Sequence, residues 1–387
     1  MSDAKEVRLG DVADLNWGDT SKTKASYVPD GHLAYSASGP DGFLPYYDFE
    51  GPGVVISAIG ANCGQTWLAK GKWSCIKNTL RFWSITKEAD TEYLYWLTRS
   101  PDFWPKRGSA QPFISQGDAR ALRVALPPAK TQRAVAKLLG SLNEKIALNQ
   151  RMNETLEAMA RAIFKDWFVD FGPTRAKMEG RPPYLAPDTW AHFPARLDGD
   201  GKPDGWKPGL VADLAKVAGG KQLHASLIAP TGTVPVFGGA GPMGFTQSHN
   251  VQGWVITFGR VGAYCGQFFW TKGKAWINNN ASLVTPKDER DAEWLFLCMS
   301  SFDLHPVKKG AAQPFISNGD MAAFPVTIPP AGVRHAFRTV IGPLFDRQQL
   351  GLLETSILVD IRDLLLPKLM SGEILMKDAE KAVEALV

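Results

Sequence analysis

The sequence has few of the residues that most often carry chemistry in proteins. It contains four cysteines and six histidines among 387 residues. The histidines are scattered singly, so neither a zinc site nor a hydrolytic triad has a full set of candidates. No two cysteines have C-x-x-C spacing. We therefore expect all four to be small, buried, apolar residues, at Cys63, Cys75, Cys265 and Cys298.

Long apolar runs are absent too. No stretch of about 18 apolar residues occurs, and the first residues do not resemble a secretory leader, which argues against a membrane span or export. We expect a cytoplasmic protein. The formal net charge of +4 is small, so charge alone says little for a polyanionic partner. The length suits two or three domains, each with its own core.

Enzymatic motifs are missing or defective. No G-x-x-x-x-G-K-[ST] loop exists, so the chain does not encode a P-loop ATPase. At Arg181-Pro182-Pro183-Tyr184 an arginine stands where an adenine methyltransferase needs an acceptor side chain. Gly239-x-Gly241-x-x-Gly244 fits a dinucleotide loop only formally, because no helix is expected to follow it. We expect a binding protein without catalytic residues, without a metal and without a cofactor of its own.

One long segment, in contrast, occurs twice. Residues 108–118 read Gly-Ser-Ala-Gln-Pro-Phe-Ile-Ser-Gln-Gly-Asp, and residues 310–320 read Gly-Ala-Ala-Gln-Pro-Phe-Ile-Ser-Asn-Gly-Asp, 202 positions later. The same offset pairs Cys63-Gly64-Gln65 with Cys265-Gly266-Gln267, and Lys70-Gly71-Lys72 with Lys272-Gly273-Lys274. A repeat this long indicates a duplicated domain with its connector. The chain should therefore have two sites that are equivalent in architecture.

Each copy begins with a mixed α+β domain. Short β-branched and aromatic runs between Gly, Pro, Asn and Asp predict strands and tight turns, as in Gly53-Val-Val-Ile-Ser and Gly253-Trp-Val-Ile-Thr. The residue patterns at 91–97 and 292–299 predict short helices. The Lys70 and Lys272 segments predict hairpin turns.

A long helix should follow each domain. Residues 131–171 lack proline and predict a helix of about 40 residues, about 60 Å long. Its heptad seam, with two asparagines suited to fixing register, comprises Leu139, Leu142, Ile146, Asn149, Asn153, Leu156, Ala160, Ile163 and Trp167. The second helix should run from Val333 to about Leu366, with a kink or late start near Pro343 and a stop or kink at Pro367. Its apolar stripe comprises Leu350, Leu353, Ile357, Ile361 and Leu364.

Such helices favour pairing with each other, although each could instead be a core helix of its own domain. The intervening residues 172–206 are rich in Pro and Gly and predict a structured or semi-rigid linker. If the helices pack antiparallel, a pseudo-twofold axis relates the two copies.

Several features of the sequence together resemble one known family. They are the order of domain, helix, domain, helix, the two Ala-Gln-Pro-Phe-Ile-Ser segments, the Pro-Pro before each helix, and Leu-Leu-Leu-Pro-Lys-Leu-Met-Ser-Gly-Glu-Ile at residues 364–374. It is the specificity (S) subunit of type I restriction-modification systems, the HsdS family. The segment Phe164-Lys-Asp-Trp-Phe-Val-Asp-Phe and the linker resemble it as well, so the likeness covers essentially the whole chain.

The resemblance implies an α+β protein with two target recognition domains separated by two long antiparallel helices that form a coiled coil. The predicted parts are domain 1 at 1–127, helix 1 at 128–171, a linker at 172–206, domain 2 at 207–328, helix 2 at 329–375 and a tail at 376–387. Each domain would bind one half of a bipartite double-stranded DNA target, and the helices would set the spacer. The implied partners are two methyltransferase subunits and restriction/translocase subunits, which alone would use S-adenosylmethionine and ATP.

Polar loop residues are the candidates for DNA contact. Arginine can bridge guanine acceptors, asparagine can pair with adenine, and lysines suit phosphates. The same residue types also cap turns or lie in solvent, so each assignment has a structural alternative. The candidates are Lys70, Lys72, Lys77, Asn78, Arg107, Gln111, Arg260, Lys272, Lys274, Asn278, Asn279, Asn280, Lys308, Lys309 and Gln313.

The repeated segment itself allows two interpretations. It either contacts DNA or forms a scaffold turn, with Phe113 and Phe315 packed inward and Gln111 or Gln313 bound to backbone; we favour the scaffold turn. For the whole chain, the alternatives to DNA recognition are a tandem module for a glycan or protein ligand and a coiled-coil scaffold.

Overall fold

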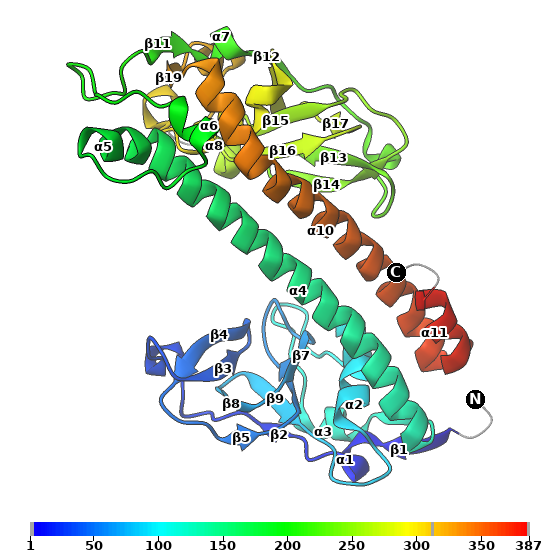
Figure 1. Cartoon of the computed structure of the whole chain (residues 1–387). Coiled ribbons are helices and arrows are strands. Elements are labelled where there is room, and N and C mark those ends of the chain that lie inside the picture. The colour runs from blue at the N-terminus through cyan, green and yellow to red at the C-terminus, as the bar shows by residue number, and fades with distance from the viewer. Residues whose placement is uncertain (1–3, 311–312, 385–387) are drawn as a thin grey trace. The chain divides into compact units, whose positions relative to one another are not determined.

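The computed structural model describes residues 4–310 and 313–384 (Figure 1). The remaining residues belong to the start of the predicted first domain, to the second copy of the repeated segment and to the end of the tail, and these parts of the predictions lie outside the described residues. The chain forms two compact units, one of Met1–Leu148 with Thr355–Val387 and one of Asn149–Glu354. Each unit contains one globular domain and a part of both long helices. The predicted domain boundaries within the units stay a prediction.

The first domain contains two four-stranded sheets and a two-stranded one, with strand orders β2-β9-β6-β7, β4-β3-β8-β5 and β1-β10. Its short helices are α1 (Leu9–Val12), α2 (Thr91–Thr98) and α3 (Gln116–Ala121). Its strands are β1 Lys5–Arg8, β2 Asn16–Trp17, β3 His32–Ser36, β4 Gly39–Leu44, β5 Phe49–Glu50, β6 Gly53–Ser57, β7 Thr66–Ala69, β8 Lys72–Cys75, β9 Thr79–Phe82 and β10 Arg123–Leu126.

The second domain has the same arrangement with one strand fewer, in the orders β12-β18-β15-β16, β14-β13-β17 and β11-β19. Its short helices are α7 (Val211–Leu214), α8 (Ala292–Ser300) and α9 (Asn318–Ala322). Its strands are β11 Lys207–Leu210, β12 Ala215–Gly219, β13 Val234–Gly238, β14 Gly241–Thr246, β15 Trp254–Gly259, β16 Phe268–Lys272, β17 Trp276–Ile277, β18 Ala281–Pro286 and β19 Pro325–Ile328. The prediction of two mixed α+β domains is confirmed, and so are both short helices, α2 and α8.

The predicted hairpins at Gly71 and Gly273 are wrong. β7 belongs to one sheet and β8 to the other, and β16 and β17 are divided in the same way. Each glycine therefore marks a corner where the chain crosses between two sheets. Gly71 has a φ of 70° and Gly273 a φ of 109°, a region that side-chain-bearing residues rarely adopt. The repeated Lys-Gly-Lys thus marks a sheet-to-sheet crossing.

Two long helices accompany the domains. α4 spans Ala129–Phe168 and α10 spans Ala331–Ser371, and α11 (Met376–Glu384) follows. α10 runs through both Pro343 and Pro367, so the late start and the stop predicted there are wrong. A proline removes one backbone hydrogen bond, but Phe337, Ile341 and Phe345 on either side of Pro343 are fully or almost fully buried. Packing holds the helix together across the break in its hydrogen bonding.

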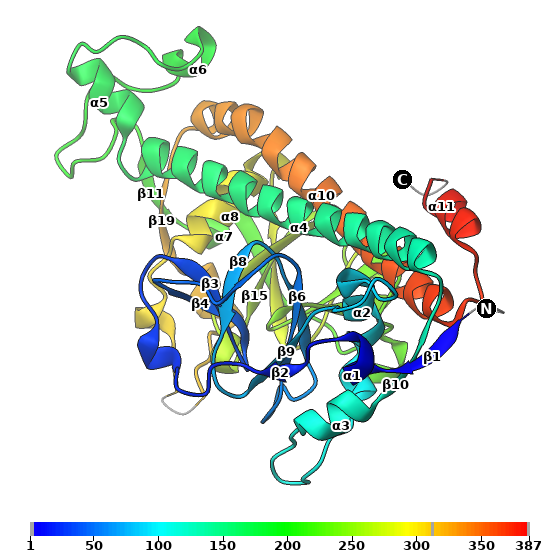
Figure 2. The same cartoon turned by 90° about the horizontal axis from the view of Figure 1, so that it is seen from below.

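The predicted seam of α4 faces the core in both units. In the first unit Leu139, Leu142 and Ile146 lie in one hydrophobic cluster with Leu358, Ile361 and Leu365 of α10. In the second unit Ala160, Phe164 and Trp167 share a cluster with Phe337, Ile341 and Phe345. Asn149 and Asn153 are buried as well, while Leu156 and Ile163 are partly buried. The pairing of the two helices is confirmed, and Figures 1 and 2 show α10 beside α4.

The helices run antiparallel. In the second unit Gln348 of α10 donates to the carbonyl of Asn153 at 3.4 Å, and Phe337, earlier in α10, contacts Phe164, later in α4, with ring centroids 6.1 Å apart. In the first unit Arg362 donates to Oδ1 of Asn143 at 3.1 Å. Polar groups therefore occupy several positions of the pairing face, where their partners specify register.

The predicted seam of α10 is mostly wrong. Leu350, Leu353, Ile357 and Leu364 are 59%, 55%, 48% and 60% exposed, and of the five predicted residues Ile361 alone is buried. The pairing face instead follows a heptad that contains Phe337, Ile341, Gln348, Gly351, Leu358, Arg362, Leu365 and Leu369. The sequence favours the more apolar stripe, but the helix pair buries a more polar one and exposes the leucines.

The linker between the domains is structured, as predicted, and contributes to the core of the second unit. It contains α5 (Gly172–Met178) and α6 (Pro187–Ala191). Phe193 and Trp206 are buried in the same cluster as Trp167. Trp167 and Phe193 meet edge to face with ring centroids 5.0 Å apart. The segment therefore packs on the start of the second domain rather than running free.

Candidate nucleic-acid interface

Three loops of the first domain meet at the end of β6. The amide of Ala58 donates to the carbonyl of Asn78 at 2.9 Å, and the amide of Ile114 donates to the carbonyl of Ala58 at 2.9 Å. The amide of Gly60 donates to the carbonyl of Pro112, also at 2.9 Å. We call this arrangement the loop platform; in the first domain it comprises residues 58–65, 77–78 and 107–114.

The second domain builds the same platform with the same bonds. The amide of Arg260 donates to the carbonyl of Asn280 at 3.3 Å, and the amide of Ile316 donates to the carbonyl of Arg260 at 2.9 Å. The amide of Gly262 donates to the carbonyl of Pro314 at 2.9 Å. The platform here comprises residues 260–267, 279–280, 309–310 and 313–316. The repeated sequence therefore encodes a repeated backbone frame.

The repeated segment is anchored by isoleucine rather than phenylalanine. Ile114 and Ile316 are 0% and 1% exposed, whereas Phe113 and Phe315 are 39% and 41% exposed, so the prediction that the phenylalanines pack inward is wrong. Because adjacent residues of an extended segment point in opposite directions, burying the isoleucine turns the phenylalanine outward. The segment is a rigid scaffold that presents an aromatic ring to solvent.

A pair of backbone hydrogen bonds and an ion pair close each copy of the segment. Arg107 and Phe113 exchange amide-to-carbonyl bonds of 2.8 Å, and Lys309 and Phe315 do the same at 2.9 and 2.8 Å. Arg107 pairs with Asp118 at 2.6 Å, and Lys309 pairs with Asp320 at 2.8 Å. These two cations are therefore partly neutralised by carboxylates.

The glutamines of the segment point away from the frame. Gln111 and Gln313 are both exposed, and within the described residues neither side chain makes a hydrogen bond. Their predicted binding to backbone is therefore not observed. Their amides are free to bind a ligand.

The lysines at the sheet crossings lie at the other end of β7 and β16, and the first lysine of each pair interacts with a long helix. Lys70 pairs with Glu92 of α2 at 3.2 Å and with Glu144 of α4 at 3.6 Å. Lys272 pairs with Asp346 of α10 at 2.8 Å, and its carbonyl accepts from Gln349 at 2.9 Å. Lys72 lies over the ring of Tyr47, and Lys274 is exposed. The geometry separates these four residues from the platform, and their contact with phosphate stays a prediction.

The remaining candidates differ in solvent exposure and in hydrogen bonding. Asn278 is 8% exposed and its Oδ1 accepts from the amide of Asn279 at 2.7 Å, which indicates a structural role. Asn279 and Asn280 are exposed, as are Lys77 and Asn78, the latter with a φ of 69°. Arg260 is partly buried, and its Nε has no partner among the described residues.

Lys106, directly before the platform loop 107–114, is a cation that the sequence did not single out. Lys106 is the counterpart of Lys308, as the 202-residue offset indicates, and each lies close to the glycine after a buried cysteine. Burial raises the pKa of the Cys63 thiol, and the positive charge of Lys106 only partly offsets this rise. Burial likewise raises the pKa of the Cys265 thiol, and Lys308 partly offsets that rise. The prediction that the cysteines are buried and apolar is confirmed for all four.

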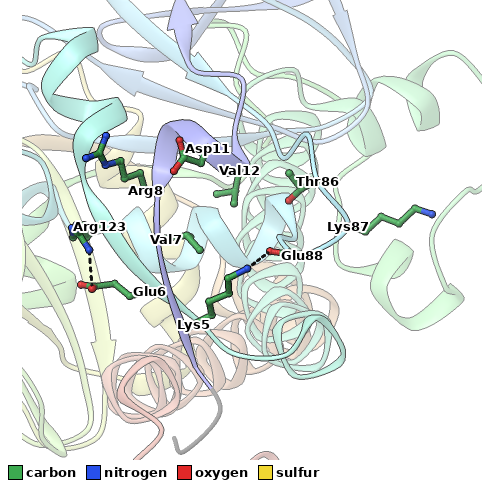
Figure 3. Close-up of a pocket in the computed structure, with 10 residues that line it drawn as sticks. All are labelled: Lys5, Glu6, Val7, Arg8, Asp11, Val12, Thr86, Lys87, Glu88 and Arg123. Carbon is green, nitrogen blue, oxygen red and sulfur yellow. Dashed lines mark hydrogen bonds and ion pairs between the residues drawn. The ribbon is translucent and has the colours of Figure 1, made fainter.

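A pocket of about 680 Å³ lies elsewhere in the first unit, at β1 and α1 (Figure 3). Its charged lining is largely paired within itself, since Lys5 contacts Glu88 at 3.2 Å and Arg123 contacts Glu6 at 3.1 Å. It contains none of the predicted DNA-binding residues. Within the described residues, no group of three or more His, Cys, Asp or Glu could hold a metal ion, and no helix is long and apolar enough to cross a membrane.

Comparison with known proteins agrees with the duplication. The family model for the type I restriction modification DNA specificity domain matches residues 1–158 and 203–335, so it matches both copies. The type I restriction enzyme HindI specificity subunit of Haemophilus influenzae is 23% identical over 362 residues, covering 76% of each chain. The MjaIX specificity subunit of Methanocaldococcus jannaschii is 24% identical over 326 residues, covering 74% of this chain and 70% of that protein.

A solved structure shares the fold. The S subunit of a type I restriction-modification system from M. genitalium superposes with a TM-score of 0.67 at 15% identity, over 95% of this chain and 96% of that one. The predicted fold of two recognition domains and two paired helices is thus confirmed. The resemblance found in the sequence is confirmed too, and this chain belongs to the type I restriction-modification DNA specificity family.

Proposed function

We propose that this chain binds a bipartite DNA target, with one half-site on each loop platform, and takes no part in catalysis. The observation that carries the proposal is the duplication of the platform. The two copies share the same backbone hydrogen bonds, but several of their side chains differ. A pair of equivalent frames suits a target with two halves. Different side chains on the same frame suit halves of different sequence.

The charge of the platforms supports a polyanionic ligand. Lys77 and Arg260 of the two platforms, and Lys308 directly before the second platform, make no ion pair within the described residues. Exposed amides lie in the same loops, since Asn78 is next to Lys77 and the carbonyl of Asn280 accepts from the amide of Arg260. Cations that are not neutralised by carboxylates release counterions when they contact phosphates. Amides and guanidinium groups can then read base edges. The platform therefore combines both kinds of group that DNA recognition requires.

The chemistry of methylation and cleavage is proposed to belong to partner subunits. The sequence lacks the acceptor that holds adenine and the loop that holds ATP, so S-adenosylmethionine and ATP are expected on those partners. Two methyltransferase subunits and the restriction subunits are the proposed partners.

The exposed apolar face of α10 is the proposed docking surface for the methyltransferase subunits. Leu350, Leu352 and Leu353 are between 55% and 59% exposed, and Leu364 is 60% exposed. A row of exposed leucines on a long helix is costly in water and typical of an interaction surface. The helix pairing does not use these side chains, so they remain available to a partner.

Exchange of one domain tests the function directly. Residues 207–327 would be replaced by the second recognition domain of another family member, and the complex would be assembled with its methyltransferase subunits. We expect the methylated sequence to change in one half only. A change in both halves, or in neither, would reject the assignment of one half-site to each domain.

Salt dependence separates DNA recognition from the glycan and protein alternatives. Binding to DNA should weaken steeply between 50 and 200 mM salt because counterions are released. Binding that hardly responds to salt would favour an uncharged ligand. Binding that is independent of every platform side chain would favour a scaffold.

A further inference from the structure

The second domain has a pocket beside its loop platform. Its volume is about 450 Å³, and it lies between the turn that joins β13 to β14 and residues of all three platform loops. Its lining consists of residues 238–242 of the turn and of Met243, Val261, Tyr264, Asn280 and Gln313. Met243, Val261 and Tyr264 are 49%, 44% and 50% exposed, so its apolar wall is open to solvent.

The pocket is hollow because the turn beside it has almost no side chains. Residues 238–241 read Gly-Gly-Ala-Gly. The carbonyl of Gly239 comes so close to Gly259 that a Cβ on Gly259 would collide with it, and a Cβ on Gly239 would lie 3.0 Å from the carbonyl of Asn280. The turn therefore packs against the platform through backbone alone. The space above it is open to solvent.

The first domain fills the corresponding place with a polar network. Asp41, the counterpart of Met243, pairs with Lys24 at 2.6 Å and accepts from Ser36 at 2.7 Å and from the hydroxyl of Tyr27 at 2.8 Å. Asn62, the counterpart of Tyr264, donates to the carbonyl of Ala37 in the turn at 3.2 Å. The side chains that line a pocket in one copy are tied together in the other.

The frame around these residues is nevertheless the same. Asn78 and Gln111 occupy the positions of Asn280 and Gln313, and Ile59 that of Val261. The two domains thus share two amides and one β-branched position. They differ at positions 41/243 and 62/264 and in the turn, which reads Ser36-Ala37-Ser38-Gly39 in the first domain. Different side chains on a common backbone frame are the expected way for two copies to read different sequences.

We propose that the pocket formed by Met243, Val261, Tyr264, Asn280 and Gln313 is a specificity-determining site that reads an A·T base pair in the second half-site. This inference rests on the proposed function. An Asn or Gln amide can bond both N6 and N7 of adenine, and an apolar side chain can contact the methyl group of thymine. The pocket offers both kinds of group side by side, with Asn280 and Gln313 as amides and Met243, Val261 and Tyr264 as the apolar wall.

The first domain keeps Ile59 but has Asp41 and Asn62 in place of the apolar Met243 and Tyr264. A buried thymine methyl would meet the Lys24–Asp41 ion pair there, and desolvating such a pair without compensation is unfavourable. The first half-site is therefore read differently at the equivalent position, although Gln111 is present in the same place.

The test uses the complete methyltransferase complex and maps the methylated sites in DNA for wild type and variants. The variant M243D/Y264N introduces the residues of the first domain, and Q313A removes one amide but leaves the apolar wall intact. Two variants serve as matched controls. L210A alters an exposed leucine of the same domain outside the pocket, and Q111A removes the equivalent amide of the first domain.

We expect M243D/Y264N and Q313A each to lower the preference for A·T at one position of the second half-site by about fivefold to 100-fold, the range for one base contact. The first half-site and the spacer should not change, and L210A and Q111A should leave the second half-site as it is. An unaltered second half-site in Q313A, or a change in the first half-site, would overturn the inference. If the wild-type complex failed to methylate a bipartite sequence at all, the proposed function would fall before these variants were compared.

Discussion

Two adjacent leucines of α10 separate the helix-pairing face from the exposed face. Leu365 is 3% exposed and lies in the core cluster of the first unit, whereas Leu364 is 60% exposed. Each would be replaced by alanine in the full chain. Because leucine and alanine have similar helix propensities, the substitutions differ in packing alone.

Truncation of Leu365 leaves a cavity among packed side chains. A buried Leu→Ala change costs about 2 to 5 kcal/mol, the sum of lost transfer free energy and the cavity. Leu364 is mostly exposed, so its truncation leaves no buried cavity, and such a change should stay within about 0.5 kcal/mol. L365A should therefore lower the free energy of unfolding by at least about four times as much as L364A.

Urea unfolding followed by far-UV circular dichroism provides the measurement. The free energy of unfolding comes from the midpoint and the m-value of each variant, and a mutation that shifts the midpoint alone has changed stability. Equal losses in the two variants would refute the assigned pairing face. L364A should instead weaken assembly with the methyltransferase subunits, which L365A should disturb only through stability.

Three further outcomes follow from charged groups. Burial raises the pKa of Glu293, whose Oε2 has no hydrogen-bond partner within the described residues. A carboxyl group whose pKa is raised in the folded state contributes stability in acid, and this contribution is lost as pH rises through the folded-state pKa. E293Q should therefore raise the free energy of unfolding by about 1 kcal/mol at pH 7 and by nothing at pH 4, and a gain that is independent of pH would contradict this. Arg334 binds both oxygens of buried Asp291, at 2.8 and 2.9 Å, so R334A should cost about 3 to 5 kcal/mol in urea unfolding. R290A, which breaks an exposed ion pair, should cost far less than R334A, and equal costs would refute the contrast. K308A should weaken DNA binding for all sequences alike and reduce the slope of log K against log salt by about 1; an unchanged slope would remove Lys308 from the phosphate contacts.

The sequence predicted the elements of this fold well because duplication repeats their signals. The matched segments revealed two domains, and the proline-free run revealed α4 to within three residues at either end. The heptad of α4 was correct because its apolar residues outnumber its asparagines. The heptad of α10 was not, because a pairing face that includes Gln348, Gly351 and Arg362 is less apolar than the face left exposed.

Side-chain direction explains the other failures. Phe113 and Phe315 point outward because the adjacent Ile114 and Ile316 are buried in the core. Composition does not reveal which of two adjacent apolar residues is buried. The ion pairs of Lys70 and Lys272 with the long helices join residues 74 positions apart in each copy. The pocket beside Met243 depends on a turn that is bare of side chains, which becomes visible only when the turn and the platform are seen together.

Mapping of methylated bases tests the central claim most directly. The chain would be produced together with its methyltransferase subunits in cells that lack other DNA methylation, and the genome would be read for modified bases. The account predicts one bipartite sequence, two defined halves with a spacer of fixed length, and no methylation when this chain is left out. Methylation that persists without the chain, or that follows one continuous sequence without a spacer, would contradict it.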